Sequence, residues 1–197
     1  MRLSDHTSRK LTSFLAENNV IEPSTRELYS YCFDFVLDIL FFNLSVILIG
    51  CLLRKPLPAL IYIITMTPMK MMAGGAHARS IEMCSVISYA VAIGSILLSS
   101  NIHLSVRNTE YELIVFFVCL ISIIALAPVD TPNKRFDTLK RRRLKICCLI
   151  YSMILAVLYM VFYIQNITVC YSIMTICVII IAINQYIGIC VNMLRQQ

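Results

Sequence analysis

A histidine and a cysteine near the middle of the chain are the residue types that thiol chemistry needs. His77 lies in the stretch MMAGGAHARSIEMC, and Cys84 follows it by seven residues. In such a pair the imidazole takes the thiol proton, and the sulfur attacks a carbonyl carbon. On one continuous helix seven residues rise about 10.5 Å, too far for a hydrogen bond between the two side chains. A working pair therefore requires His77 to lie on irregular chain that folds back over the helix carrying Cys84.

Two adjacent glycines provide the break that this arrangement requires. Gly74 and Gly75 permit backbone conformations that other residues resist, so they are predicted to end a helix just before His77. Ser80 is a plausible N-cap, which would place Cys84 in the first turns of the next helix, where the helix dipole is positive. On spacing alone, a structural histidine and a packed cysteine are the more frequent outcome. The carboxylates available to orient the histidine are Glu82, Asp130, Asp34 and Asp38.

The composition places these residues in a membrane protein. Of 197 residues, 59% are hydrophobic and 14% are charged, whereas soluble domains have roughly 45–50% and about 25%. This excludes a disordered chain and a nucleic-acid-binding domain with a polar surface. Five apolar segments approach the roughly 20 residues that cross a bilayer. They are 29–53, 81–100, 112–128, 146–165 and 168–194.

A sixth apolar segment, 57–73, is shorter and holds Pro58 and Pro68. It is either a tilted span, a broken helix or a re-entrant piece buried in protein. The prediction is an all-α integral membrane protein with about six transmembrane helices, forming a single domain over residues 1–197. The N-terminal segment 1–23 is basic and weakly amphipathic. It either lies on the membrane surface or forms a frayed polar tail.

The nine cysteines do not have the spacing of a metal site or a disulfide framework. Their number is odd and no CxxC pair occurs, so neither a metal nor a cofactor is predicted. Seven of them lie inside apolar runs and are predicted to be small buried hydrophobes. These seven are Cys51, Cys119, Cys147, Cys148, Cys170, Cys177 and Cys190. Cys32 and Cys84 lie at the ends of apolar runs and stay open as candidates.

One segment, 133–145, carries the net charge of the chain. It holds seven Lys and Arg, and the total formal charge is +6. Since Lys and Arg stay on the cytoplasmic side, this loop is predicted to be cytoplasmic, together with both termini and the 70–80 segment. Arg54 and Lys55 would then lie outside, which fits the six-span arrangement poorly. The loop either attracts anionic lipid headgroups, at roughly 1 kcal/mol per charge, or docks an acidic peptide tail.

Two motifs together give the chain a family resemblance. Gly74-Gly75-Ala76-His77-Ala78, with Cys84 following, is one; the later stretch 127–134, APVDTPNK, is the other. Their combination resembles the accessory gene regulator B (AgrB) family over essentially the whole chain. One departure is Lys70, where the family commonly has Arg. An ammonium group does not reproduce the bidentate hydrogen bonding of a guanidinium, so if this position contacts the substrate, its specificity is expected to differ from that of the family.

The resemblance implies a cysteine endopeptidase of bacterial quorum sensing, embedded in the cell membrane with its active site near the cytoplasmic face. Its substrate would be an AgrD-like precursor peptide with an acidic C-terminal tail. Cys84 would be the nucleophile and His77 the general base, forming a thioester that an internal Cys or Ser of the peptide converts to a ring. Supporting or substrate-contacting candidates are Lys70, Gly74, Gly75, Asp130, Asn133, Lys134, Arg141, Arg142 and Arg143.

Two other classes of function remain open from the sequence. A peptide transporter or export channel would use Asp34, Asp38 and Asn43 as polar groups within the membrane. It lacks an obvious inverted repeat. A non-catalytic membrane scaffold would tolerate loss of both His77 and Cys84. Membrane lipids are expected partners of any of these, no nucleic acid is expected, and a homodimer is left open.

Overall fold

The computed structural model describes residues 3–18, 20–76, 80–105, 109–129 and 137–194. Its elements are helices throughout this described part. The chain divides into two compact units, residues 1–48 and residues 49–197, which are considered separately. The long helix α2 (Arg26–Leu52) begins in the first unit and ends in the second. The single domain predicted over 1–197 stays a prediction.

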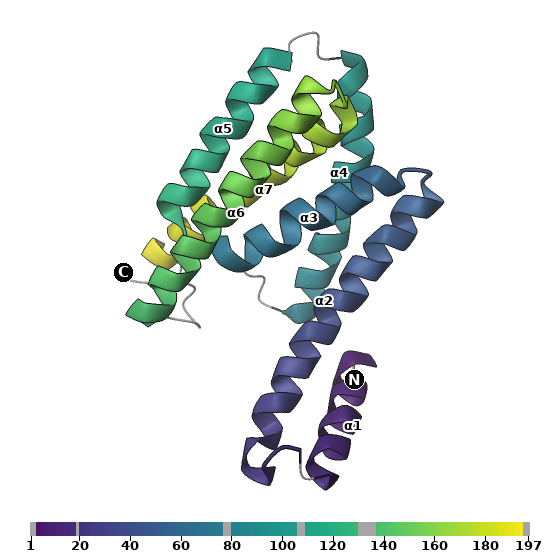
Figure 1. Ribbon diagram of the computed structural model, residues 1–197, viewed down its shortest axis with the longest axis vertical. Helices are drawn as coiled ribbons and strands as arrows, with labels where there is room; N and C mark the ends of the chain where they lie inside the picture. Colours follow the sequence, from purple (N-terminus) through teal and green to yellow (C-terminus); the bar gives the residue numbers. More distant parts are fainter. Residues whose placement is uncertain (1–2, 19, 77–79, 106–108, 130–136, 195–197) are drawn as a thin grey trace. The chain divides into compact units, whose positions relative to one another are not determined.

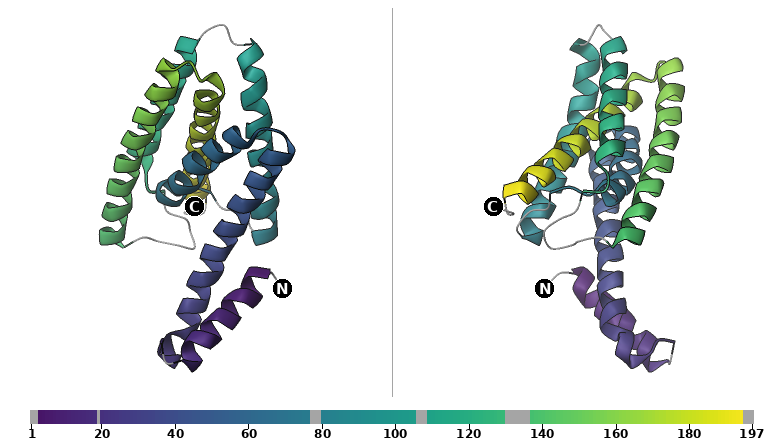
Figure 2. Two further views of the ribbon diagram at one scale, coloured as in Figure 1. Left: turned by 45° about the vertical axis from the view of Figure 1, so that its right-hand side comes forward. Right: turned by 90° about the vertical axis from the view of Figure 1, so that its left-hand side faces the viewer.

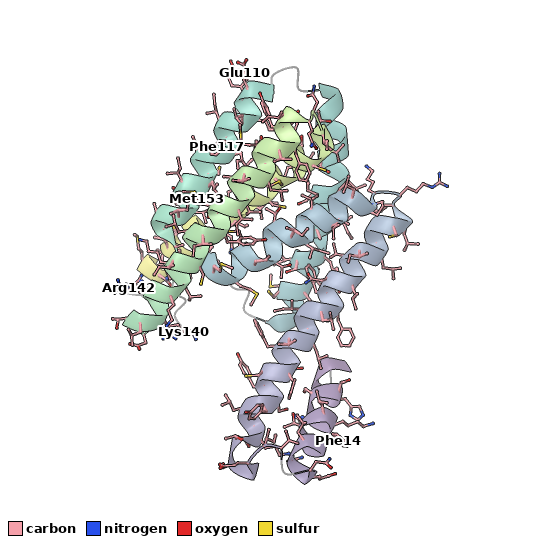
Figure 3. The ribbon with its side chains drawn as sticks, viewed as in Figure 1. Phe14, Glu110, Phe117, Lys140, Arg142 and Met153 are labelled. Carbon is pink, nitrogen blue, oxygen red and sulfur yellow. The ribbon has the colours of Figure 1, made fainter. Side chains whose placement is uncertain are left out.

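The first unit contains α1 (Leu3–Glu17), a short 3-10 turn (Pro23–Thr25) and most of α2. The N-terminal segment is helical rather than a frayed tail. Ser8 and Thr12 are buried on α1, whereas Leu11 is exposed and the Phe14 side chain is 61% exposed. Figure 3 shows Phe14 on α1. The outward apolar side chains fit the predicted membrane-surface segment.

The second unit is a bundle built around its last helix. It contains α3 (Pro56–Ala73), α4 (Ile81–Ser105), α5 (Thr109–Leu126), α6 (Thr138–Ile164) and α7 (Thr168–Leu194). The last of these, α7, packs against all four of the others and lies among them in each view (Figures 1 and 2). Its buried side chains include Ile173, Met174 and Ile181. Except at the start of α6, the helix bounds lie near those of the predicted apolar segments, and the described part of the chain is all-helical, as predicted.

The number of membrane spans is confirmed only in part. Within the described residues, four helices are long and apolar enough to cross a membrane: α2, residues 82–99 of α4, α6 and α7. The helices α3 and α5 have 18 residues each. The count of six therefore stays a prediction for these two.

The broken-helix alternative for 57–73 is wrong, because α3 continues through Pro68. A proline in a helix has no N–H for the carbonyl four residues earlier. Here that carbonyl belongs to Ile64, and the Tyr151 hydroxyl of α6 donates a hydrogen bond to it. In an apolar surrounding this bond satisfies a backbone group that the helix itself leaves open.

Two further sequence predictions differ from the structure. Cys148, Cys170 and Cys177 are buried as predicted, but Cys51, Cys147 and Cys190 are exposed and Cys119 is half-buried. A lipid-facing residue is as apolar as a buried one, so an apolar run does not distinguish them. The basic segment predicted as a loop is helical from Thr138, where α6 begins.

Candidate active site

The predicted break before His77 is present. The helix α3 ends at Ala73, where the Gly74 amide still donates to Lys70 O at 3.3 Å. The next two residues have positive φ angles, 72° at Gly74 and 128° at Gly75. Residues other than glycine are strained at these positive φ angles, so both glycines are needed for the turn. The chain thereby leaves the helix axis immediately before the candidate base.

The turn lies beside the second motif of the sequence. Gly74 forms a parallel bridge with Val129, and the Val129 amide donates to Ala73 O at 2.9 Å. A Cβ atom added at Gly74 would lie 2.3 Å from Val129 O. The two motifs are far apart in sequence, and the structure joins them through their backbones.

The other side of the turn is held by α7. The Ala76 amide donates to Asn184 O at 3.2 Å. A Cβ added at Gly75 would come within 2.3 Å of Asn184 Nδ2, and one added at Gly188 within 2.9 Å of Ala76 N. Residues 74–76 are therefore confined between the end of α5 and the face of α7, and glycines on both partners permit the close approach.

Cys84 lies in the first turn of α4, as predicted. Ser80 caps this helix: the Met83 amide donates to Ser80 Oγ at 3.2 Å, and the Cys84 amide donates to Ser80 O at 3.1 Å. The thiol is free and half-buried. A cysteine at the start of a helix lies where the backbone dipoles favour negative charge.

Several predicted site residues lie outside the described part of the chain. These are His77, Asp130, Asn133 and Lys134. Lys70 is described, and lies half-buried in the last turn of α3. Glu82 is exposed in the first turn of α4, whereas Asp34 and Asp38 belong to the first unit.

The basic side chains Arg141, Arg142 and Arg143 are exposed in the first turns of α6. Asp137 caps this helix, accepting the Thr138 amide at 2.7 Å. Figure 3 shows Lys140 and Arg142 toward the end of the bundle where α5 finishes, with Glu110 at the opposite end. The positive charge and the end of α5 that contacts the glycine turn therefore share one side of this unit.

Sequence reasoning did not identify the contribution of α7. Three residues of α7 contact the turn or the end of α3: Asn184, Gln185 and Gly188. The signal was present, because two adjacent carboxamides in an apolar helix are costly and usually have a role. Among the described residues, no cluster of three His, Cys, Asp or Glu side chains could hold a metal ion.

The glycine turn and the second motif, which contact each other in the structure, both lie within the region that a known family model matches. The family model described as accessory gene regulator B matches residues 8–189. The chain belongs to the accessory gene regulator B family. The resemblance found in the two motifs is thereby confirmed.

Two relatives come from Clostridium perfringens. An AgrB-like protein of strain SM101 is 30% identical over 149 residues, and AgrB-like protein 2 of strain 13 is 27% identical over 149 residues. Each alignment covers 72% of this chain and 66% of the relative, slightly less than two thirds of its length. No solved structure matches this chain. Family membership supports a general role in accessory gene regulation.

Proposed function

We propose that the chain is a membrane cysteine endopeptidase that removes the C-terminal tail of an AgrD-like precursor peptide. One observation carries the proposal. The glycine turn that directly precedes His77 is held between residues 127–129 and α7, while Cys84 occupies the capped first turn of α4. The chain therefore leaves α3 before it reaches His77, and α4, which carries Cys84, begins after His77 at Ile81.

The reaction uses the two side chains in sequence. His77 takes the Cys84 proton as the sulfur attacks the carbonyl carbon before the tail, and the imidazolium returns the proton to the departing amine. The C–N bond breaks and a C–S thioester forms. A Cys thiol or Ser hydroxyl within the upstream peptide then attacks the thioester, closes a thiolactone or lactone ring, and restores the Cys84 thiol.

The location of the site within the protein also supports this function. The basic first turns of α6 lie on the side of the second unit where α5 ends beside the glycine turn. Since basic segments stay in the cytoplasm, this side would face the cytoplasm, where a newly made precursor is found. Exclusion of water near the membrane would protect the thioester from hydrolysis.

The test co-produces the chain with the AgrD-type precursor peptide of the same genome and measures tail removal. Cys84→Ala, Cys84→Ser and His77→Ala should abolish it with normal membrane insertion. Cys147→Ser, at an exposed cysteine on α6, is the matched control and should cleave normally. Normal tail removal by Cys84→Ala would reject the mechanism. Release of uncut peptide from vesicles holding the purified chain would favour the transporter.

A further inference from the structure

Gln185 is a polar side chain at the centre of the second unit that the proposed reaction does not use. It lies on α7 and is 0% exposed. A carboxamide in an apolar interior is costly unless it is hydrogen-bonded. Its contacts therefore show what the side chain does there.

The carboxamide of Gln185 contacts two other helices through its nitrogen. Nε2 donates to Ala73 O at 3.1 Å and to Ile123 O at 3.4 Å. A side-chain amide has two N–H donors on its nitrogen, and both neighbours are acceptors, so this orientation is the favourable one. Oε1 has no partner among the described residues. Among the described residues, the Gln185 side chain therefore acts only as a hydrogen-bond donor.

The two carbonyl groups that Gln185 contacts also accept hydrogen bonds from backbone amides of the second motif. Ala73 O accepts the Val129 amide at 2.9 Å, and Ile123 O accepts the Ala127 amide at 2.9 Å. Ala73 is the residue immediately before the glycine turn. One side chain therefore links the end of α3, the end of α5 and the first residues of the second motif at their shared acceptors.

We propose that Gln185 is a positioning residue for tail removal: its two N–H bonds hold the glycine turn against residues 127–129 and so fix the chain that enters His77. The proposal rests on the proposed peptidase function. Gln185 acts through the turn and touches no reacting atom. Losing its donors should therefore impair the chemical step more than peptide binding.

The test uses the full chain purified into lipid vesicles and a synthetic AgrD-type precursor from the same genome. Gln185→Met keeps the size of the side chain and removes both donors. It should lower kcat by at least about tenfold, with KM within about twofold of the wild type. Gln185→Asn keeps the donors on a shorter side chain and should recover part of kcat.

The matched control is Thr175→Val, which removes another buried hydrogen-bonding group from α7. The Thr175 hydroxyl contacts Tyr171 O of the same helix at 3.0 Å and the Tyr159 hydroxyl of α6 at 3.5 Å, away from the glycine turn. Its kcat should stay at the wild-type level. Amide hydrogen exchange by mass spectrometry gives a readout without substrate. Gln185→Met should speed exchange in residues 73–76 and 127–129 and leave α6 unchanged.

Each outcome decides the proposal. Wild-type kcat in Gln185→Met overturns it, and so does faster exchange spread evenly over α6 and α7, which would mean general loosening. If the wild-type chain does not cleave the peptide, the peptidase function fails by itself. The exchange pattern then tests only whether Gln185 holds the glycine turn in place. Faster exchange confined to residues 73–76 and 127–129 supports this role, and unchanged exchange rejects it.

Discussion

The glycine turn at residues 74–76 and the basic first turns of α6 represent two different ways of building a functional region. The turn is defined by its backbone: positive φ angles, a bridge to Val129 and a hydrogen bond from the Ala76 amide to Asn184 O. The α6 region is defined by exposed charged side chains on an ordinary helix. In the turn, one added methyl group should lower the rate of tail removal. On α6, the sign of the charge should determine how well the acidic tail binds, and the identity of each residue should have much less effect.

Outside the candidate catalytic pair, the largest effect is expected from Gly75→Ala. The φ of 128° is strained for alanine, and its Cβ would lie 3.1 Å from the backbone oxygen of Asn184 as well as 2.3 Å from Asn184 Nδ2. Since displacement of a catalytic segment by about 1 Å can cost about 100-fold in rate, tail removal should fall by at least that factor. Gly94→Ala is the matched control, because its Cβ would meet nothing within 4 Å. Equal activity of the two variants would contradict the structure of the turn.

A smaller loss of tail removal is expected from Gly188→Ala on α7, the helix that contacts the glycine turn. Its Cβ would lie 2.9 Å from Ala76 N and from Gly75 C, so the turn must shift by a few tenths of an ångström. Overpacking of this kind costs about 1–3 kcal/mol. A barrier higher by about 1.4 kcal/mol, near the low end of that range, corresponds to about a tenfold loss of tail removal. Rates of cleavage in vesicles, compared with those of Gly94→Ala, measure it. A Gly188→Ala variant as active as the control would show that α7 does not confine the turn.

On α6, charge reversal should weaken the binding of the acidic tail. Changing Arg141, Arg142 and Arg143 together to Glu replaces three attractions with repulsions. Exposed ion pairs contribute about 0.2–1 kcal/mol each, so KM should rise by about tenfold. The same three residues changed to Lys should keep KM near wild type. Adding basic residues to the tail should partly restore processing by the Glu variant. Unchanged processing with correct topology would leave lipid contact as the role of these residues.

The smallest effect is expected from Ser80→Ala. The variant loses the cap on α4, worth about 1 kcal/mol, and should lower tail removal by no more than about fivefold. Ser80→Asp retains a capping oxygen and should keep most of the activity. If Ser80→Ala were as damaging as Gly75→Ala, Ser80 would have a role beyond capping.

The sequence predicted local features better than long-range contacts. The helix break at Gly74 and the Ser80 cap follow from single-residue preferences, and most helix bounds, except the start of α6, follow from the lengths of apolar runs. The pairing of Gly74 with Val129 and the role of Gln185 depend on how the bundle packs, which no local pattern specifies. Cysteine exposure was mispredicted at Cys51, Cys147 and Cys190 because lipid-facing and buried positions have the same composition.

The start of α6 was also mispredicted, for an identifiable reason. The run of Lys and Arg at 133–145 is too polar to lie within the bilayer and therefore predicts a loop. Helices extend beyond the bilayer, and Arg141 is already within the first turns of α6. Charge therefore indicates the side of the membrane and does not indicate where a helix begins.

The role of Cys84 as the nucleophile is tested most directly by mass spectrometry of the chain quenched in acid during turnover of the AgrD-type precursor. We expect the upstream peptide to be attached to Cys84 as a thioester, released by hydroxylamine and absent from Cys84→Ala. Tail release with no adduct on Cys84 at any time, at the same rate in Cys84→Ala, would contradict this role.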